Sequence, residues 1–394
     1  MSTICLRYVA LMTAALVIVG CGEGNRKKSE DGGSAVVSTV TPVKIGAVLP
    51  LTGDVASWGE DSSNGINLAI EIANHSSKKY AFSVVYEDSK GSAAEAVSAA
   101  RKLTSVDKVV AIIGDNVSGP TIALVPIADK AKIPVISPSA SSPKLSGMSK
   151  YFFRVYPSDT VEGSYMAKVA RETLGLKRVV ILFVTNDFGT GLRDVFQKSF
   201  EDTGGAVVES LGYNEDETDF RPYLTKAKAA NPDGVYLAGY FKDGGAILKQ
   251  ARELGIESRF LGSTTHEDPQ LITIGQDAAN GLVYPFSTGY DEQSTEEAVV
   301  TFQEAFKRKY NKPPGLVAAL GYDCARVTIA AVEKAGPQSE SIRKEFAATQ
   351  KFPGASGEIT FDANGDVHKA VHLKTVKDGK FVLWETEGPI NETP

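Results

Sequence analysis

Residues 43–74 read VKIGAVLPLTGDVASWGEDSSNGINLAIEIAN, and this stretch is the clearest indication of the fold. Its first part, 43–51, is an almost continuous apolar run, which is typical of a strand covered on both faces of a parallel sheet. Its second part, 58–74, repeats apolar residues at helical spacing. A strand followed by a helix is half of a β–α–β unit, so the stretch predicts an α/β protein with parallel strands.

The alternation of strand and helix continues along the chain in two successive sets. The segment 151–159, between the sets, is predicted to be a connection. Two sets predict two doubly wound parallel-sheet lobes rather than one large sheet. The further predicted strands are 80–88, 109–114 and 134–139 in the first set, and 177–185, 206–213, 234–240 and 259–264 in the second.

The end of the chain has a different pattern. Helices are predicted near 295–311, 315–336 and 338–349. The segment 357–384 then alternates apolar and polar residues and carries an Asn-Gly and an Asp-Gly turn signal. This combination predicts a β-meander.

The N-terminus has the features of a bacterial lipoprotein. Arg7 precedes an apolar run at 8–19, which is too short to span a membrane and suits a signal peptide. The run ends in IVGC, which resembles a lipobox, so we expect 1–20 to be removed and Cys21 to be acylated and held in the membrane by its lipid. A plain cleaved signal peptide is the alternative. Residues 21–42 are then a lipidated flexible tether, because they are rich in Gly, Ser and Lys.

Composition and charge exclude several classes of protein. The 394 residues include 42 Lys and Arg against 48 Asp and Glu, a net charge of −6. A nucleic-acid-binding protein usually presents a basic face, so no nucleic-acid partner is expected. The apolar share of 42% is that of an ordinary globular chain rather than a disordered one.

Motifs for catalysis and cofactors are weak or broken. The sequence around Gly189 and Gly191 has Asp194 where the third glycine of a dinucleotide motif belongs, and no acidic residue ends the next strand to bind a ribose. No G-x-S-x-G sequence is present, which argues against an α/β-hydrolase. We therefore expect no enzymatic activity, no catalytic residue and no cofactor.

Metal binding is not expected either. His368 and His372 fall in a predicted strand, where their spacing only places both on one face. The sequence 362–366 resembles the start of a calcium loop, but Leu373 stands where the loop needs a glutamate, so a hairpin turn is the better interpretation. The three cysteines have no zinc-type spacing, and Cys324 is expected to be a small buried apolar group.

Hydroxyl and aromatic residues follow the predicted strands at their carboxyl ends, where open parallel sheets bind ligands. Ser118, followed by Gly119 and Pro120, is predicted to cap a helix whose free N–H groups bind a carboxylate; a plain cap is the alternative. The residues at these ends are Trp58, 115–118, 139–142, 187–188, Tyr240 and 264–267.

Several stretches together resemble the leucine/isoleucine/valine-binding family, the type I periplasmic solute-binding proteins of ABC importers. The resemblance covers about 43–384 and includes its lipoprotein form. The stretches that carry it are 43–74, IGDNVSGPT, PVISPSASSPKL, FRVYPSD, NDFGTG, YLAGYFKDGGAILKQARELG and GYDCARVTIAAV.

The resemblance implies two lobes joined by a hinge and closing over an amino acid. The first lobe is expected to comprise 43–157 and 287–356, and the second 158–286 and 357–394. The ligand's carboxylate and ammonium positions fall on Ser118, Ser139, Ala140 and Ser141, and its side-chain pocket on Trp58, Phe188 and Tyr240.

One position departs from the family pattern. Where branched-chain binders place an acidic residue against the ligand ammonium, this chain has Thr264. Glu267 or Asp187 could substitute from a neighbouring position, or the ligand could lack an ammonium.

The resemblance leads to one functional hypothesis and two alternatives. The chain is expected to be an extracytoplasmic substrate-binding lipoprotein, anchored by lipid at Cys21. It would present a hydrophobic or branched-chain amino acid, or a related small carboxylate, to an ABC permease in the membrane. The alternatives are a ligand-sensing receptor component with the same fold, and an enzyme acting in the cleft.

Overall fold

The computed structural model describes residues 40–384, which form two sheets with helices between the strands. The strand order is β2-β1-β3-β4-β5 in the five-stranded sheet and β12-β11-β10-β9-β8-β6-β7 in the seven-stranded sheet. Neighbouring strands are parallel except at β10–β11 and β11–β12. The predicted α/β fold with two parallel-sheet lobes is therefore confirmed.

The first lobe consists of the five-stranded sheet and the six helices α1–α3 and α9–α11. Its strands are β1 (Thr41–Leu49), β2 (Tyr80–Asp88), β3 (Ile112–Gly114), β4 (Val135–Ser137) and β5 (Phe152–Arg154). Its helices are α1 (Ala56–Ser76), α2 (Ala93–Lys102), α3 (Ser118–Ala131), α9 (Glu297–Tyr310), α10 (Leu316–Ala335) and α11 (Ser339–Ala347).

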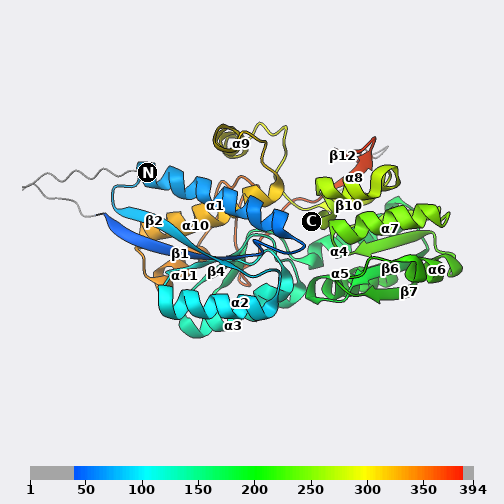
Figure 1. Ribbon diagram of the computed structural model, residues 1–394, viewed down its shortest axis with the longest axis horizontal. Helices are drawn as coiled ribbons and strands as arrows, with labels where there is room; N and C mark the ends of the chain where they lie inside the picture. The colour runs from blue at the N-terminus through cyan, green and yellow to red at the C-terminus, as the bar shows by residue number, and fades with distance from the viewer. Residues whose placement is uncertain (1–39, 385–394) are drawn as a thin grey trace, which may run out of the picture. The chain divides into compact units, whose positions relative to one another are not determined.

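Close packing of α1 against α10 covers one face of this sheet (Figure 1). A Cβ on Gly65 would lie 2.0 Å from the carbonyl oxygen of Ala318, and one on Gly321 would lie 2.4 Å from that of Ser62. Only glycine at both positions allows the two helix backbones to approach so closely. The helices α2 and α3 lie side by side on the other face (Figure 1).

The second lobe consists of the seven-stranded sheet with α4–α8, where α4 packs beside α5 and α7 beside α8 (Figure 1). Its strands are β6 (Arg178–Val184), β7 (Ala206–Tyr213), β8 (Gly234–Ala238), β9 (Arg259–Leu261), β10 (Val283–Phe286), β11 (His372–Lys377) and β12 (Lys380–Leu383). Its helices are α4 (Asp159–Lys168), α5 (Asp187–Asp202), α6 (Arg221–Ala229), α7 (Phe241–Glu253) and α8 (Pro269–Gly275).

Short helical turns complete the description. The turns Leu103–Asp107 and Val169–Thr173 extend α2 and α4 as π-helices, and Pro143–Leu145, Thr264–His266 and Gln276–Ala279 are 3₁₀ turns. No helix among residues 40–384 is long and apolar enough to cross a membrane.

Two expectations about local structure are wrong. The segment 151–159 is not only a connection, because Phe152–Arg154 form β5 and pair in parallel with β4. Three buried residues are too few to show a strand pattern in the sequence. The meander predicted over 357–384 exists only as the antiparallel hairpin of β11 and β12, whose turn places Asp378 and Gly379 at positive φ.

The chain before that hairpin belongs to the other lobe. Ile359, Phe361 and Val367 pack in the core of the first lobe, and their segment makes only isolated bridges, Phe352 to Ile359 and Phe361 to Val367. The expected assignment of everything from 357 onward to the second lobe is therefore wrong for this segment. Apolar alternation shows that a segment packs against a core, but not which of two cores.

Three segments of the chain connect the lobes: 155–158 before α4, 287–296 before α9, and 368–371 before β11. The described part of the chain has two lobes joined at these segments, as expected from the type I periplasmic-binding fold. The other boundaries of the lobes remain predictions. The signal peptide at 1–20 lies outside the described residues, as do Cys21 and nearly all of the tether at 21–42.

Candidate ligand-binding site

A cavity of about 140 Å³ lies between the lobes, at the carboxyl ends of strands from both sheets. A cavity of about 150 Å³ can hold a benzene-sized group, so this one suits a small molecule. Its walls include seven of the eight predicted site residues: Trp58, Ser118, Ser139, Ser141, Phe188, Tyr240 and Thr264.

Ala140 is the predicted residue that the cavity wall does not contain. Its side chain is fully buried in the core of the first lobe, and its N–H donates to Ser137 Oγ at 3.0 Å. That N–H is already used and does not face a ligand.

The N-terminus of α3 forms one wall of the cavity. The prediction that Ser118 caps this helix is wrong: Val117 is the N-cap, with extended backbone, and Ser118 is the first helical residue. Ser118 Oγ instead accepts a hydrogen bond from the N–H of Ser142 at 3.1 Å. The first N–H groups of a helix have no partners within the helix, and they favour an anion at this end.

Ser139 takes part in a hydrogen-bond network rather than standing free in the wall. Its hydroxyl donates to the carbonyl oxygen of Asn116 at 3.1 Å and accepts from Asn116 Nδ2 at 3.0 Å. Asn116 Nδ2 also donates to Ser62 Oγ at 2.9 Å. The network fixes the loops after β3 and β4 relative to each other, so Ser139 orients the cavity wall. Its hydroxyl has no further hydrogen to donate to a ligand, because it already donates to Asn116.

Aromatic and aliphatic side chains form the apolar part of the cavity. Phe188 stacks on Tyr240 with ring centroids 5.2 Å apart, and Trp58 meets Tyr240 edge-on at 5.6 Å. Asn186 Nδ2 donates to the Tyr240 hydroxyl at 3.1 Å, which holds this ring in place. Three residues from the start of α10, Leu316, Val317 and Leu320, complete this part. The arrangement suits an apolar side chain of a ligand.

Two buried carboxylates on α4, Asp159 and Glu162, form a wall that the sequence analysis missed. Glu162 Oε1 accepts a hydrogen bond from the Thr264 N–H at 2.7 Å, and its Oε2 accepts from the Tyr156 hydroxyl at 3.0 Å. The Asp159 N–H donates to the carbonyl oxygen of Ser141 at 2.8 Å. Asp159 Oδ2 is buried and has no hydrogen-bond partner among the described residues.

Burial determines the protonation of both groups. It raises the pKa of Glu162 to about 7. Burial, followed by the charge of Glu162, raises the pKa of Asp159 well above its usual range. No Lys, Arg or His side chain among residues 40–384 lines the cavity. Three further acidic residues do line it: Asp61, Glu267 and Asp268. The cavity is therefore rich in carboxyl groups and poor in positive charge.

The two acids suggested as substitutes at Thr264 are both engaged elsewhere. Glu267 lines the cavity but pairs with Lys374 and accepts from the Tyr284 hydroxyl at 2.8 Å. Asp187 is not part of the wall and pairs with Lys144 at 2.7 Å. The acid beside Thr264 is instead Glu162. A signal for it existed, because Glu162 lies one helical turn after the Asp159 that ends the FRVYPSD stretch.

A family model described as periplasmic binding protein matches residues 42–380. The chain belongs to the periplasmic binding protein family. Proteins of this family bind solutes outside the cytoplasm and are not enzymes, and the predicted resemblance is confirmed.

The relatives of this periplasmic binding protein include a leucine-, isoleucine-, valine-, threonine- and alanine-binding protein of Pseudomonas aeruginosa. It is 27% identical over 329 residues, which are 82% of this chain and 87% of the relative. The crystal structure of the leucine-binding protein LivK from Thermotoga maritima is 33% identical, with a TM-score of 0.82, and the match covers 87% of this chain and 98% of that one.

A third match is a branched-chain amino acid transporter substrate-binding protein with its ligand bound. This is LivJ from Streptococcus pneumoniae in complex with isoleucine, 29% identical with a TM-score of 0.80; the match covers 86% of this chain and 98% of LivJ. The periplasmic binding protein described here thus shares its fold with proteins that bind branched-chain amino acids.

Proposed function

We propose that this chain is the substrate-binding lipoprotein of an ABC importer, and that it binds an α-amino acid with a small apolar side chain in the cavity between its lobes. It would deliver the ligand to a membrane permease while its lipid at Cys21 holds it at the membrane. The observation that carries the choice of ligand is the unpartnered oxygen of Asp159, buried beside Glu162 in the cavity wall.

The two ends of an amino acid match two opposite features of the cavity. A buried carboxylate without a partner is costly, and an ammonium group compensates it by charge and by hydrogen bonds. Asp159 and Glu162 offer that environment on α4. The N-terminus of α3 with the Ser118 hydroxyl suits the ligand's carboxylate. The apolar ring and aliphatic side chains between them suit a leucine-like side chain.

This arrangement accounts for Thr264. A ligand ammonium does not need an acid at 264 if Glu162 provides one, and the Thr264 N–H then holds the Glu162 carboxylate in position. An amine-free acid would bring no positive charge to Asp159 and Glu162, which makes that class of ligand a poorer match than an amino acid.

Calorimetry of the purified protein with leucine and with its deaminated keto acid, 4-methyl-2-oxopentanoate, tests the proposal. Leucine should bind at least about tenfold more tightly than the keto acid. A charge-assisted hydrogen bond is stronger than a neutral one, and the difference in free energy corresponds to about a factor of ten in affinity. Asp159→Asn should reduce the preference for leucine, while a surface control, Asp202→Asn, should leave it unchanged. Equal affinity for both ligands in the wild type would contradict the proposal.

A further inference from the structure

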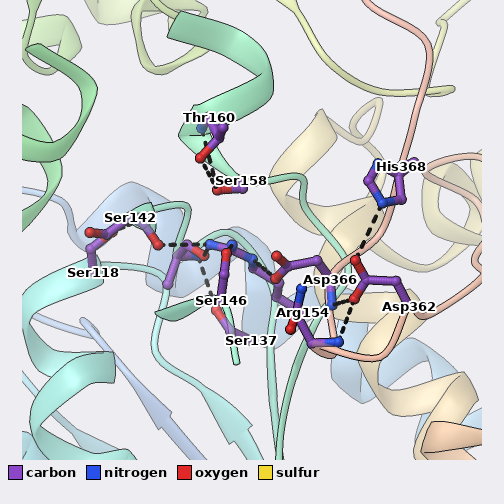
Figure 2. Close-up of polar contacts among 12 residues, drawn as sticks. Ser118, Ser137, Ser142, Ser146, Arg154, Ser158, Thr160, Asp362, Asp366 and His368 are labelled. Atoms are coloured by element: carbon purple, nitrogen blue, oxygen red, sulfur yellow. Dashed lines mark hydrogen bonds and ion pairs between the residues drawn. The ribbon is translucent and has the colours of Figure 1, made fainter. Parts of the chain in front are cut away.

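Arg154 is a fully buried arginine that lies behind the cavity wall rather than in it. Its guanidinium donates through Nη1 to the carbonyl oxygens of Ala140 and Ser142, at 3.2 and 3.0 Å. Nη2 donates to Ser146 Oγ at 2.7 Å, and Nε pairs with Asp366 Oδ1 at 2.7 Å. Figure 2 shows Arg154 between Ser142, Ser146 and Asp366.

The carbonyl oxygens held by Arg154 belong to the loop after β4, residues 139–142, which we call the serine loop. Ser139 and Ser141 of this loop line the cavity, and the N–H of Ser142 donates to Ser118 Oγ. The carbonyl oxygen of Ser141, between the two that Arg154 holds, accepts from the N–H of Asp159 at the start of α4. By fixing the carbonyl groups at 140 and 142, Arg154 sets the direction of the peptide groups that meet both α3 and α4.

Asp366 is itself held in place by a tight turn, the 362–366 segment that resembles the start of a calcium loop. Asp362 Oδ1 accepts hydrogen bonds from the N–H groups of Asn364 and Asp366, at 2.8 and 3.0 Å. The N–H of Arg154 donates to the carbonyl oxygen of Gly365 at 3.0 Å. The carboxyl groups of this turn therefore contact the chain's own N–H groups, Arg154 and, through Asp362 Oδ2 at 3.4 Å, His368.

The ion pair also lies at the base of two connections between the lobes. Segment 155–158 follows Arg154 directly, and segment 368–371 begins two residues after Asp366. A buried ion pair adds little net stability compared with apolar residues of the same volume, so stability alone is a weak reason for one here. Its hydrogen bonds lead instead to the serine loop.

We propose that Arg154 and Asp366 are positioning residues that hold the serine loop and the first turn of α4 in the arrangement that binds the ligand. This inference rests on the proposed function for the identity of its probe, leucine. Neither residue lines the cavity. Arg154 acts through the carbonyl oxygens of Ala140 and Ser142, and Asp366 acts by fixing the guanidinium.

A graded set of variants tests this pair. Arg154→Lys keeps the charge but loses the planar fork, so it cannot bond to Asp366 and to both carbonyl oxygens together. We expect leucine affinity to fall about tenfold or more. Asp366→Asn keeps a side-chain oxygen that can accept from Arg154 Nε but removes the negative charge. Leucine affinity should then fall about threefold. Ser146→Ala removes a partner of Arg154 outside the serine loop and should leave affinity within about twofold, which makes it the matched control.

Hydrogen exchange of the Ser142 amide, measured without ligand, separates the inference from the proposed function. Exchange should speed up in Arg154→Lys and, less, in Asp366→Asn, but not in Ser146→Ala. If wild-type protein does not bind leucine, the exchange result still tests the pair. If Arg154→Lys does not fold, the comparison of Asp366→Asn with Ser146→Ala decides. Asp366→Asn could instead exchange the Ser142 amide and bind leucine as the wild type does, and differ only in a lower melting temperature. That result would mean a purely structural role for the pair and would overturn the inference.

Discussion

The chemistry of the cavity depends on which residue supplies negative charge beside Thr264. The acid is Glu162, whose carboxylate accepts from the Thr264 N–H, and Asp159 lies three residues before it on the same helix. The hydroxyl groups expected to bind a ligand differ in what they can still donate. The Ser118 hydroxyl accepts a hydrogen bond from the chain and can donate one to a ligand, whereas the Ser139 hydroxyl already donates its hydrogen bond to the carbonyl oxygen of Asn116.

Leucine affinity should depend on pH through Glu162. Without ligand the pKa of Glu162 is about 7, so below that pH most molecules carry the neutral carboxyl group. An ammonium binds the charged form, and binding must then release a proton. Affinity should fall by up to about tenfold for each pH unit below 7 and level off above it. Calorimetry from pH 5.5 to 8.5 measures this slope, which Glu162→Gln should reduce, with Asp159 as the remaining carboxyl group of raised pKa. An equal slope in both proteins would contradict the assignment.

The stability of the ligand-free protein should change with pH in the opposite direction. The folded pKa of Glu162 lies above its ordinary value of 4.5, so its contribution is fully present below about pH 4.5 and is lost as the pH rises through 7. The melting temperature of the wild type should therefore fall between pH 5 and pH 8, and it should fall by less in Glu162→Gln. A fall of the same size in the variant would show that Glu162 does not titrate in this range.

At the scale of elements, the site depends on where helices begin. The starts of α1, α3 and α10 bring Trp58, Ser118 and Leu316 to the cavity. The helices α1 and α10 keep this arrangement because Gly65 and Gly321 let their backbones meet.

Gly65→Ala should destabilise the protein by about 1–3 kcal/mol, because its Cβ would lie 2.0 Å from the backbone oxygen of Ala318 and the helices must move apart. Urea unfolding of the ligand-free protein measures the change. Gly315→Ala is the matched control, since its Cβ has no neighbour within 4 Å, and it should cost less than about 1 kcal/mol. Equal losses in the two variants would mean that the packing of α1 on α10 tolerates a methyl group.

At the scale of the whole molecule, the cavity has walls from both lobes, so a ligand can favour an arrangement in which they meet. Contacts between the lobes outside the cavity include the ion pairs of Lys144 with Asp187 and of Lys242 with Asp54. They also include a part-buried hydrogen bond from Ser142 Oγ to the carbonyl oxygen of Asp187 at 3.1 Å. Exposed ion pairs contribute little, so a ligand that contacts both lobes adds to what holds them together.

Solution scattering should therefore give a smaller radius of gyration with saturating leucine than without it. The physical reason is that ligand contacts to α3 and to α4 are made together only when the lobes are close. Asp159→Asn, with weaker binding, should need more leucine for the same change. An unchanged scattering profile at full occupancy would argue against closure of the lobes.

The proposed lipid anchor also concerns the whole molecule. Cys21→Ser should release the mature protein from membranes, because the variant lacks the thiol that the proposed acylation needs, and two acyl chains suffice for stable anchoring. Leucine affinity should stay the same, since the cavity is built entirely from residues 58–320. Detergent-free fractionation of wild type and variant measures retention, and equal retention would contradict acylation at this position.

The sequence by itself determined the type and order of most elements, the two-lobe fold and seven residues of the cavity wall. These follow from local patterns: apolar runs and helical spacing define elements, and candidate ligand-binding residues follow the carboxyl ends of strands. The tertiary structure alone decided the acid beside Thr264, the lobe of segment 359–367 and the pair of Arg154 with Asp366. Glu162 and Thr264 are 102 residues apart, and Arg154 and Asp366 are 212 apart. Such pairs form because packing brings distant segments together, and no local pattern records which segments will meet.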